Sequence, residues 1–108
     1  MEGLFYHIFE SVPVPVVFVD TSHVIRYVNR AARDKYAKPD RSLVGRSIFD
    51  CHSEASCEII KRCYERLVAG EDVVSMRINK KADVVFLVAV RDDAGRLLGY
   101  YEYPDDPA

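Results

Sequence analysis

The sequence has little of what several protein classes require. Its three cysteines are an odd and small number, so a disulfide framework is not expected. No apolar run approaches the roughly 20 residues of a membrane-spanning helix, and Met1 is followed by Glu2 rather than by a basic segment. A net charge of −2 gives no electrostatic case for nucleic acid or an anionic membrane. These absences predict a cytoplasmic protein that contacts neither partner directly.

Patterns typical of catalysis are also missing. There is no Ser/His/Asp ordering, no pair of carboxylates on one cavity-facing segment and no phosphate-binding glycine loop. We therefore expect a protein that is not an enzyme. The 108 residues suffice for one domain. We divide them into a flanking helix at 1–12, the domain proper at 13–104, and a tail or linker at 105–108, which suggests one module of a longer protein.

The strongest local signal is a hairpin near the end of the chain. Two apolar, β-branched and aromatic runs, 82–91 and 96–103, flank the turn Asp92-Asp93-Ala94-Gly95. The first run is apolar on both faces, and a sheet with two apolar faces must be covered on both sides. The rest of the chain has to supply two covers.

The remaining segments can be ordered around this hairpin. Apolar spacing predicts a helix over 2–11, and Asn29 and Ser53 are N-caps for two further helices. The full set is a helix at 2–11, strands at 16–20 and 24–28, helices at 30–37, 46–52 and 53–69, and a strand at 72–79 before the hairpin. This order predicts an α+β fold with one five-stranded antiparallel sheet. The helices inserted between the second and third strands should cover one face, and the N-terminal helix the other.

Three stretches together resemble the PAS domain, a sensory fold. An apolar strand ending in Asp20, a turn, a second strand and Asn29 before small residues are similar to the opening of that family. Leu43-Val44-Gly45 resembles its step before the long helix, and Asp92–Gly99 resembles its last hairpin. His23 departs from the pattern, because glycine is common in that turn. A terminal Asp-Ile-Thr is also replaced, by Tyr103-Pro104-Asp105.

The resemblance implies a sensory or dimerisation module of a bacterial or archaeal signalling protein, such as a kinase or a transcription regulator. A ligand would lie between the sheet and the inserted helices, and an output domain of a longer chain would receive the signal. We expect a homodimer through the first helix, by way of Leu4, Phe5, Ile8 and Phe9. An interaction domain with a solid interior is the alternative. The fold alone assigns no cofactor, because it hosts many ligands or none.

A second alternative rests on Cys51-His52-Ser53-Glu54-Ala55-Ser56. This stretch is similar to a step in haem-binding PAS regulators, in which the matching histidine ligates iron, and Met76 would supply the second ligand. Imidazole and thioether suit haem iron. The favoured structural interpretation is that His52 donates to a nearby backbone carbonyl and packs into the core. Cys57 and Cys63 are badly spaced for zinc.

The candidate cavity is drawn from the apolar and aromatic residues of the predicted helices and hairpin. Its expected lining is Tyr36, Phe49, Ile60, Tyr64, Phe86, Val88 and Tyr100. Plain core packing is the competing interpretation for these aromatic side chains. Among the polar residues, Arg26 and Arg77 are expected to face solvent or to pair with Glu102, and His23 to be exposed in its turn.

Overall fold

The structure is a computed structural model that describes residues 2–36, 42–77 and 84–105. Its elements follow the predicted order, which confirms the α+β class. They are α1 (Glu2–Ser11), β1 (Val17–Asp20), β2 (Ile25–Val28), α2 (Arg30–Tyr36), the 3-10 helix η1 (Ile48–Cys51), α3 (Glu54–Val68), β3 (Val73–Met76), β4 (Val85–Arg91) and β5 (Leu97–Pro104). The predicted ends at residues 37 and 79 lie outside the described residues.

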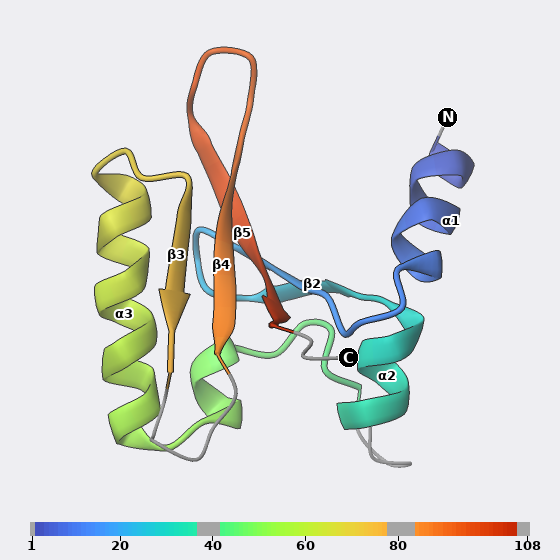
Figure 1. Cartoon of the computed structure of the whole chain (residues 1–108), viewed down its shortest axis with the longest axis horizontal. Helices are drawn as coiled ribbons and strands as arrows, with labels where there is room; N and C mark the ends of the chain where they lie inside the picture. The colour runs from blue at the N-terminus through green and yellow to red at the C-terminus, as the bar shows by residue number, and fades with distance from the viewer. Residues whose placement is uncertain (1, 37–41, 78–83, 106–108) are drawn as a thin grey trace.

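The five strands form one antiparallel sheet in the order β2-β1-β5-β4-β3, so the first and last strands are neighbours (Figure 1). The five-stranded sheet predicted from the sequence is thus confirmed. β1 and β5 approach closely at Gly99, which has a φ of +153°. A Cβ atom there would collide with the carbonyl oxygen of Val19, so only glycine suits this position.

The hydrophobic core lies on the inner face of the sheet, under α3 (Figure 1). Ser53 caps α3 as predicted, and its hydroxyl accepts a hydrogen bond from the Ser56 amide. The apolar residues of α3 that are buried recur every three or four positions, as a helix packed on a sheet requires. The main core residues are Val17, Val19, Ile25, Val28, Ile48, Ile60, Cys63, Leu67, Val74, Met76, Leu87 and Tyr100.

The prediction that α1 lies on the outer face of the sheet is confirmed, but the helix covers that face only near its C-terminal end, where Phe9 contacts Tyr27. Leu4, Phe5 and Ile8 are 54%, 63% and 51% exposed, and α1 leans away from the central hairpin (Figure 1). At the base of the helix, Glu10 forms a two-pronged ion pair with Arg33 of α2. This pair joins the C-terminal end of α1 to α2, beside the point where Phe9 contacts Tyr27 of β2. None of the described helices is long and apolar enough to cross a membrane.

Asn29 joins the segment after α1 to the sheet and to α2. Its side chain is fully buried, and its Oδ1 accepts hydrogen bonds from the amides of Val16, at 2.9 Å, and Ala32, at 3.0 Å. Its Nδ2 donates to the carbonyls of Val14, at 3.0 Å, and Val12, at 3.3 Å. The predicted N-cap of α2 is confirmed. The same side chain also supplies donors to backbone carbonyls of the Val12–Val16 stretch, where two prolines lack an N–H group.

We predict that Asn29→Ala lowers the free energy of unfolding by about 2–4 kcal/mol, because it removes an N-cap and leaves buried carbonyls without donors. Asn29→Ser keeps a capping oxygen and should recover only the capping share. Urea denaturation measures both changes, with Thr21→Ala in the exposed β1–β2 turn as the control. Equal effects of serine and alanine would show that the cap contributes nothing.

Candidate functional site

A partly open cavity of about 460 Å³ lies on the inner face of the sheet, beside η1. Its volume falls within the range of small-molecule sites, about 300–1,000 Å³. Its wall is formed by residues from all five strands, from α2 and from the loop around η1. They are Val17, Ile25, Tyr36, Leu43, Arg46, Ile48, Asp50, Cys51, His52, Met76, Val85, Glu102, Tyr103 and Pro104. We call this space the inner cavity.

His52 lies in the cavity wall directly after η1. Its Nδ1 is 2.9 Å from the carbonyl oxygen of Ile48, one helical turn earlier. This contact confirms the expected hydrogen bond to a backbone carbonyl. A carbonyl can only accept, so Nδ1 carries the proton, and in the neutral ring Nε2 is left as an acceptor. The thioether of Met76 lines the same cavity, so the structure brings together the two residues of the haem alternative.

Glu102 is the polar residue that the sequence did not point to. It follows Tyr100 by two positions on β5, so both side chains face the inner side of the sheet. Its Oε2 is buried and has no hydrogen-bond partner among the described residues. Burial raises the pKa of this carboxyl, and the charge of His52 lowers it by a smaller amount. The side chain still lines the cavity, so a group inside the cavity has access to it.

The expected partners of Glu102 are found elsewhere. Arg26 lies on the other side of the sheet, and its Nε donates to Asp20 Oδ2 at 2.6 Å. Arg77 is exposed, as one alternative predicted. Glu102 was predicted only as a partner for Arg26 or Arg77, and its alternation with Tyr100 along β5 is the signal that places it inside.

Of the seven residues predicted to line the cavity, Tyr36 alone does so in this structure. Phe86 and Val88 lie on the outer face of β4, because Val85, Leu87 and Ala89 pack into the core. The Phe86 ring stacks on Tyr103, with centroids 5.3 Å apart. The other four are packed in or against the core instead of lining the cavity, namely Phe49, Ile60, Tyr64 and Tyr100.

The expectation that His23 is exposed is wrong. Its ring lies 4.6 Å from Tyr64, 4.8 Å from Phe49 and 6.4 Å from Tyr100, measured between ring centroids. Burial lowers the pKa of His23. Its backbone has a φ of +64°, which allows the turn at the position where the family favours glycine and directs the ring inward. Aromatic packing therefore fills the space beside the inner cavity.

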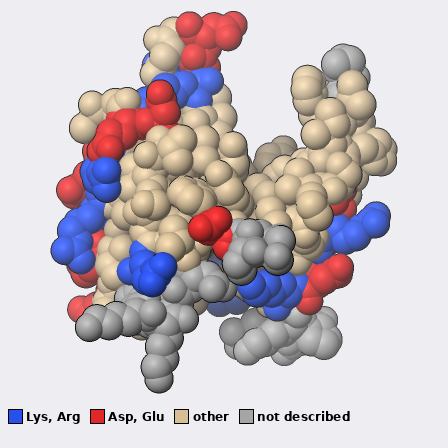
Figure 2. Space-filling view, in the orientation of Figure 1, with Lys and Arg blue, Asp and Glu red and all other residues tan. Residues whose placement is uncertain are grey.

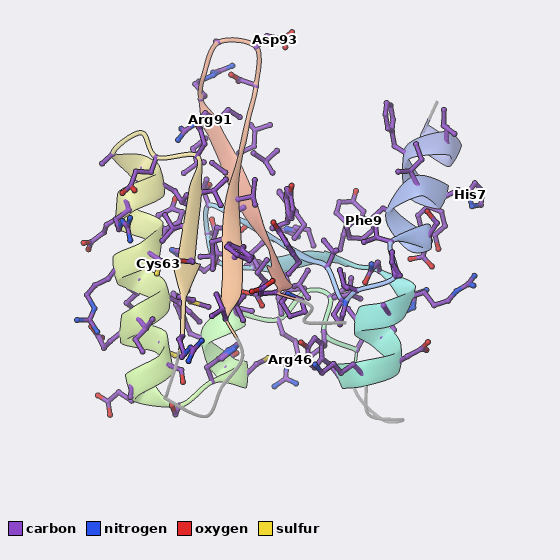
Figure 3. The ribbon with its side chains drawn as sticks, in the orientation of Figure 1. His7, Phe9, Arg46, Cys63, Arg91 and Asp93 are labelled. Atoms are coloured by element: carbon purple, nitrogen blue, oxygen red, sulfur yellow. The ribbon has the colours of Figure 1, made fainter. Side chains whose placement is uncertain are left out.

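The described residues hold no cluster of three or more histidine, cysteine or acidic side chains that could bind a metal ion. Cys57 and Cys63 are buried in α3, whereas Cys51 is exposed. The Cys57 thiol donates to the Phe49 carbonyl, with Sγ and O 3.3 Å apart, which gives it a structural role at the end of η1. Figure 3 shows Cys63 on α3 and Arg46 below the sheet, near the cavity.

A second hollow, the outer groove, separates α1 from the outer face of the sheet. It has a volume of about 990 Å³ and an apolar, aromatic lining. Phe9 points from α1 toward the sheet, whereas His7 points away (Figure 3). Charged residues gather along α3, at the hairpin tip and near α2, and leave a largely uncharged surface between (Figure 2). The groove is lined by Phe5, Tyr6, Ile8, Phe9, Val12, Val14, Val16, Phe18, Tyr27, Tyr101 and Tyr103.

The sequence matches a family described as the PAS fold over residues 9–106. The chain belongs to the PAS fold family. This confirms the resemblance drawn from the sequence, while the haem-binding detail stays a prediction. No protein of curated function matches the chain.

Solved structures support the assignment of the PAS fold. A C-terminal domain from Streptococcus mutans is 26% identical, with a TM-score of 0.75 over 97% of this chain and 84% of that one. A sensory box sensor histidine kinase from Vibrio cholerae is 13% identical, with a TM-score of 0.68 over 97% of this chain and 87% of that one. PAS domains of this kind are thus found in sensor kinases.

A similar fold is found in a DNA-binding receptor. The VqmA dimer of Vibrio cholerae, a LuxR-type receptor solved in the absence of its target DNA, is 17% identical, with a TM-score of 0.70. The match covers all of this chain and 52% of VqmA, so the chain spans about half of that receptor. VqmA is a DNA-binding neighbour, whereas the net charge argues against direct nucleic-acid binding here. That expectation stays a prediction.

We predict that Glu102→Gln stabilises the ligand-free PAS domain by about 1–3 kcal/mol at pH 8, because it replaces a buried carboxylate that has no partner. The raised pKa of Glu102 means that, above its ordinary value of 4.5, the folded state keeps a proton that the unfolded state has lost. Stability therefore falls as the pH rises from about 4.5 through the raised pKa. The advantage of glutamine should grow over that window.

The measurement is urea denaturation of both proteins between pH 4 and pH 8. His52 and Tyr100 are the titratable groups beside Glu102 and are common to both proteins. Glu71→Gln is a control of opposite sign, because the hydrogen bond with Arg66 lowers the pKa of Glu71. It should become less stable than the parent as the pH rises. A pH-independent difference for Glu102→Gln would contradict the burial of this carboxylate.

Proposed function

We propose that this PAS domain is a non-catalytic sensory module that binds a small molecule in the inner cavity and signals through a homodimer. It would serve a longer signalling protein, such as a sensor kinase or a transcription regulator. The alternative, an interaction domain without a ligand, keeps the dimer and leaves the cavity without a role.

The alternation of β5 between the inner cavity and the outer groove supports this proposal best. Glu102 faces the cavity, and its neighbour Tyr101 lines the groove on the other side of the sheet. Tyr103 borders both spaces. Because adjacent residues of a strand share one backbone, a shift of β5 caused by a ligand moves the groove as well. A ligand that favours one arrangement of β5 thereby biases whatever occupies the groove.

For the groove, we propose the α1 helix of a second copy as the occupant. Leu4, Phe5 and Ile8 expose a large apolar surface on α1, and the sheet exposes aromatic surface opposite. Exposed apolar patches of this kind mark interaction sites. The two surfaces belong to one chain, so a two-fold dimer buries both of them twice. Phe9 is already partly buried against Tyr27, with ring centroids 6.4 Å apart, and forms the floor of the interface.

Ligand binding is tested by native mass spectrometry of the protein as purified from cells. A mass excess of a small molecule is expected, and it should be lost in Val85→Phe, which fills the inner cavity. Val88→Phe adds the same volume to the other face of the same strand and should retain the ligand. The interaction alternative would be favoured if the purified protein is a dimer with no mass excess, and if adding metabolite extracts also produces none.

Dimerisation is tested with charges placed on α1. Phe5→Glu should shift the protein to a monomer in light scattering, with at least a tenfold rise in the dissociation constant, because it places a carboxylate in an apolar interface. His7→Glu puts the same charge on the side of α1 that points away from the groove, and the dimer should persist (Figure 3). Monomeric parent protein at high concentration would overturn the proposed dimer.

Haem is the second candidate, because His52 and Met76 line one cavity and the Ile48 carbonyl orients the His52 ring as metal-bound imidazoles require. Glu102 and Asp50 weigh against it, since haem itself carries two carboxylates. Protein supplied with haem should show a Soret band that His52→Ala alters if this candidate is right. An absent band, or one unchanged in His52→Ala, would exclude His52 as a ligand.

A further inference from the structure

The inner cavity presents hydrogen-bond acceptors to which the described residues donate no hydrogen bond. Glu102 Oε2 is buried without a partner in the part of the chain that the structure describes. His52 uses its Nδ1 proton on the Ile48 carbonyl, so the Nε2 of the neutral ring is a second acceptor. Both residues line the same space, whose wall is otherwise mainly apolar, with Ile25, Met76 and Val85 among its residues.

An unpaired carboxylate in an apolar wall is costly for the free protein. A buried acceptor without a donor loses its hydration and gains nothing in exchange, and the cost is greater for a charge. The arrangement is stable only because the rest of the domain supports it. Such a group is satisfied when a ligand brings the missing donors and an opposite charge.

The charges around the cavity indicate which ligands fit. The described wall carries two acidic residues, Glu102 and Asp50, against one arginine, Arg46. Asp50 is exposed and Arg46 half-buried, so these two lie toward solvent and Glu102 is the charged group shielded within. A carboxylate or phosphate ligand would place a second negative charge beside Glu102, which is unfavourable in a site with little water.

We propose that the inner cavity binds a small organic cation, an apolar body carrying a protonated amine, whose ammonium group pairs with Glu102 and donates to His52 Nε2. The apolar body lies against Ile25, Met76 and Val85. This inference rests on the proposed ligand-binding function and adds the chemical class of the ligand. An ammonium group has three donors and one positive charge, which matches two acceptors of which one is negative.

The test compares three probes with one phenyl body and different head groups. They are 2-phenylethylamine, 2-phenylethanol and 3-phenylpropionate, titrated into isotope-labelled protein at pH 8 and followed by NMR. The amine is then a cation. The amine is expected to bind at least tenfold more tightly than the alcohol, and the acid more weakly than either. Shifted resonances should map to residues 46–52 and 102–104.

Glu102→Gln provides the second arm, because glutamine has nearly the same shape without the charge. It should weaken the amine at least tenfold and change the affinity for the alcohol by less than threefold. Asp50→Asn, at the exposed side of the same cavity, should leave the preference for the amine in place. If Glu102→Gln does not fold, the order of the three probes on the parent protein decides alone.

The outcomes separate the inference from the function on which it rests. If the alcohol or the acid binds in the cavity at least as tightly as the amine, or if Glu102→Gln leaves the amine affinity unchanged, the cation inference is wrong and ligand binding stands. If no probe shifts any resonance of residues 46–52 or 102–104, both fall. A preference for the amine that Glu102→Gln removes supports both.

Discussion

The placement of α1 depends on one buried side chain. Asn29 holds the Val12–Val16 stretch against the end of β2 through two carbonyls and one amide, and it begins α2 with the same oxygen. α2 then presents Arg33 to Glu10, so the base of α1 is attached to the domain while its apolar side remains uncovered. The outer groove opens between this attached helix and the outer face of the sheet. The uncharged side-chain amide of Asn29 thus connects the segment after α1 to the rest of the domain.

The two hollows of this PAS domain are separated by a single layer of backbone. A sheet is stiff along its hydrogen-bonded ladder, so a contact made on one face moves both faces together. The inner cavity is small and mainly apolar and carries an unsatisfied acid, whereas the outer groove is larger and aromatic. Under the proposed function, the cavity takes a small molecule with a polar head group and the groove takes a helix. This arrangement suits a domain in which ligand binding in the cavity alters dimer formation at the groove.

Much of the fold was predictable, because its elements are marked by local chemistry. The caps Asn29 and Ser53 and the turn before Gly95 each carry their own signal, and the order of elements determined the sheet. The cavity was not predictable in the same way. β4 is apolar on both faces, so its period-two pattern could not tell the face of Phe86 from that of Leu87. Glu102 was predicted only to pair with an arginine, because a charged residue on a strand is normally exposed or paired.

The neighbouring positions of β1 and β5 have a kinetic consequence. The strand that emerges first pairs with the strand that emerges last, so about 80 residues separate the two halves of the central ladder. During synthesis the β1–β2 and β3–β4 pairs can form early, but the sheet stays in two pieces until Tyr100 and its neighbours arrive. Until then, β1 and β4 each present an unpaired edge to other chains. We therefore expect incomplete chains of this PAS domain to expose two unpaired edge strands that can pair with other chains, and the completed sheet covers both.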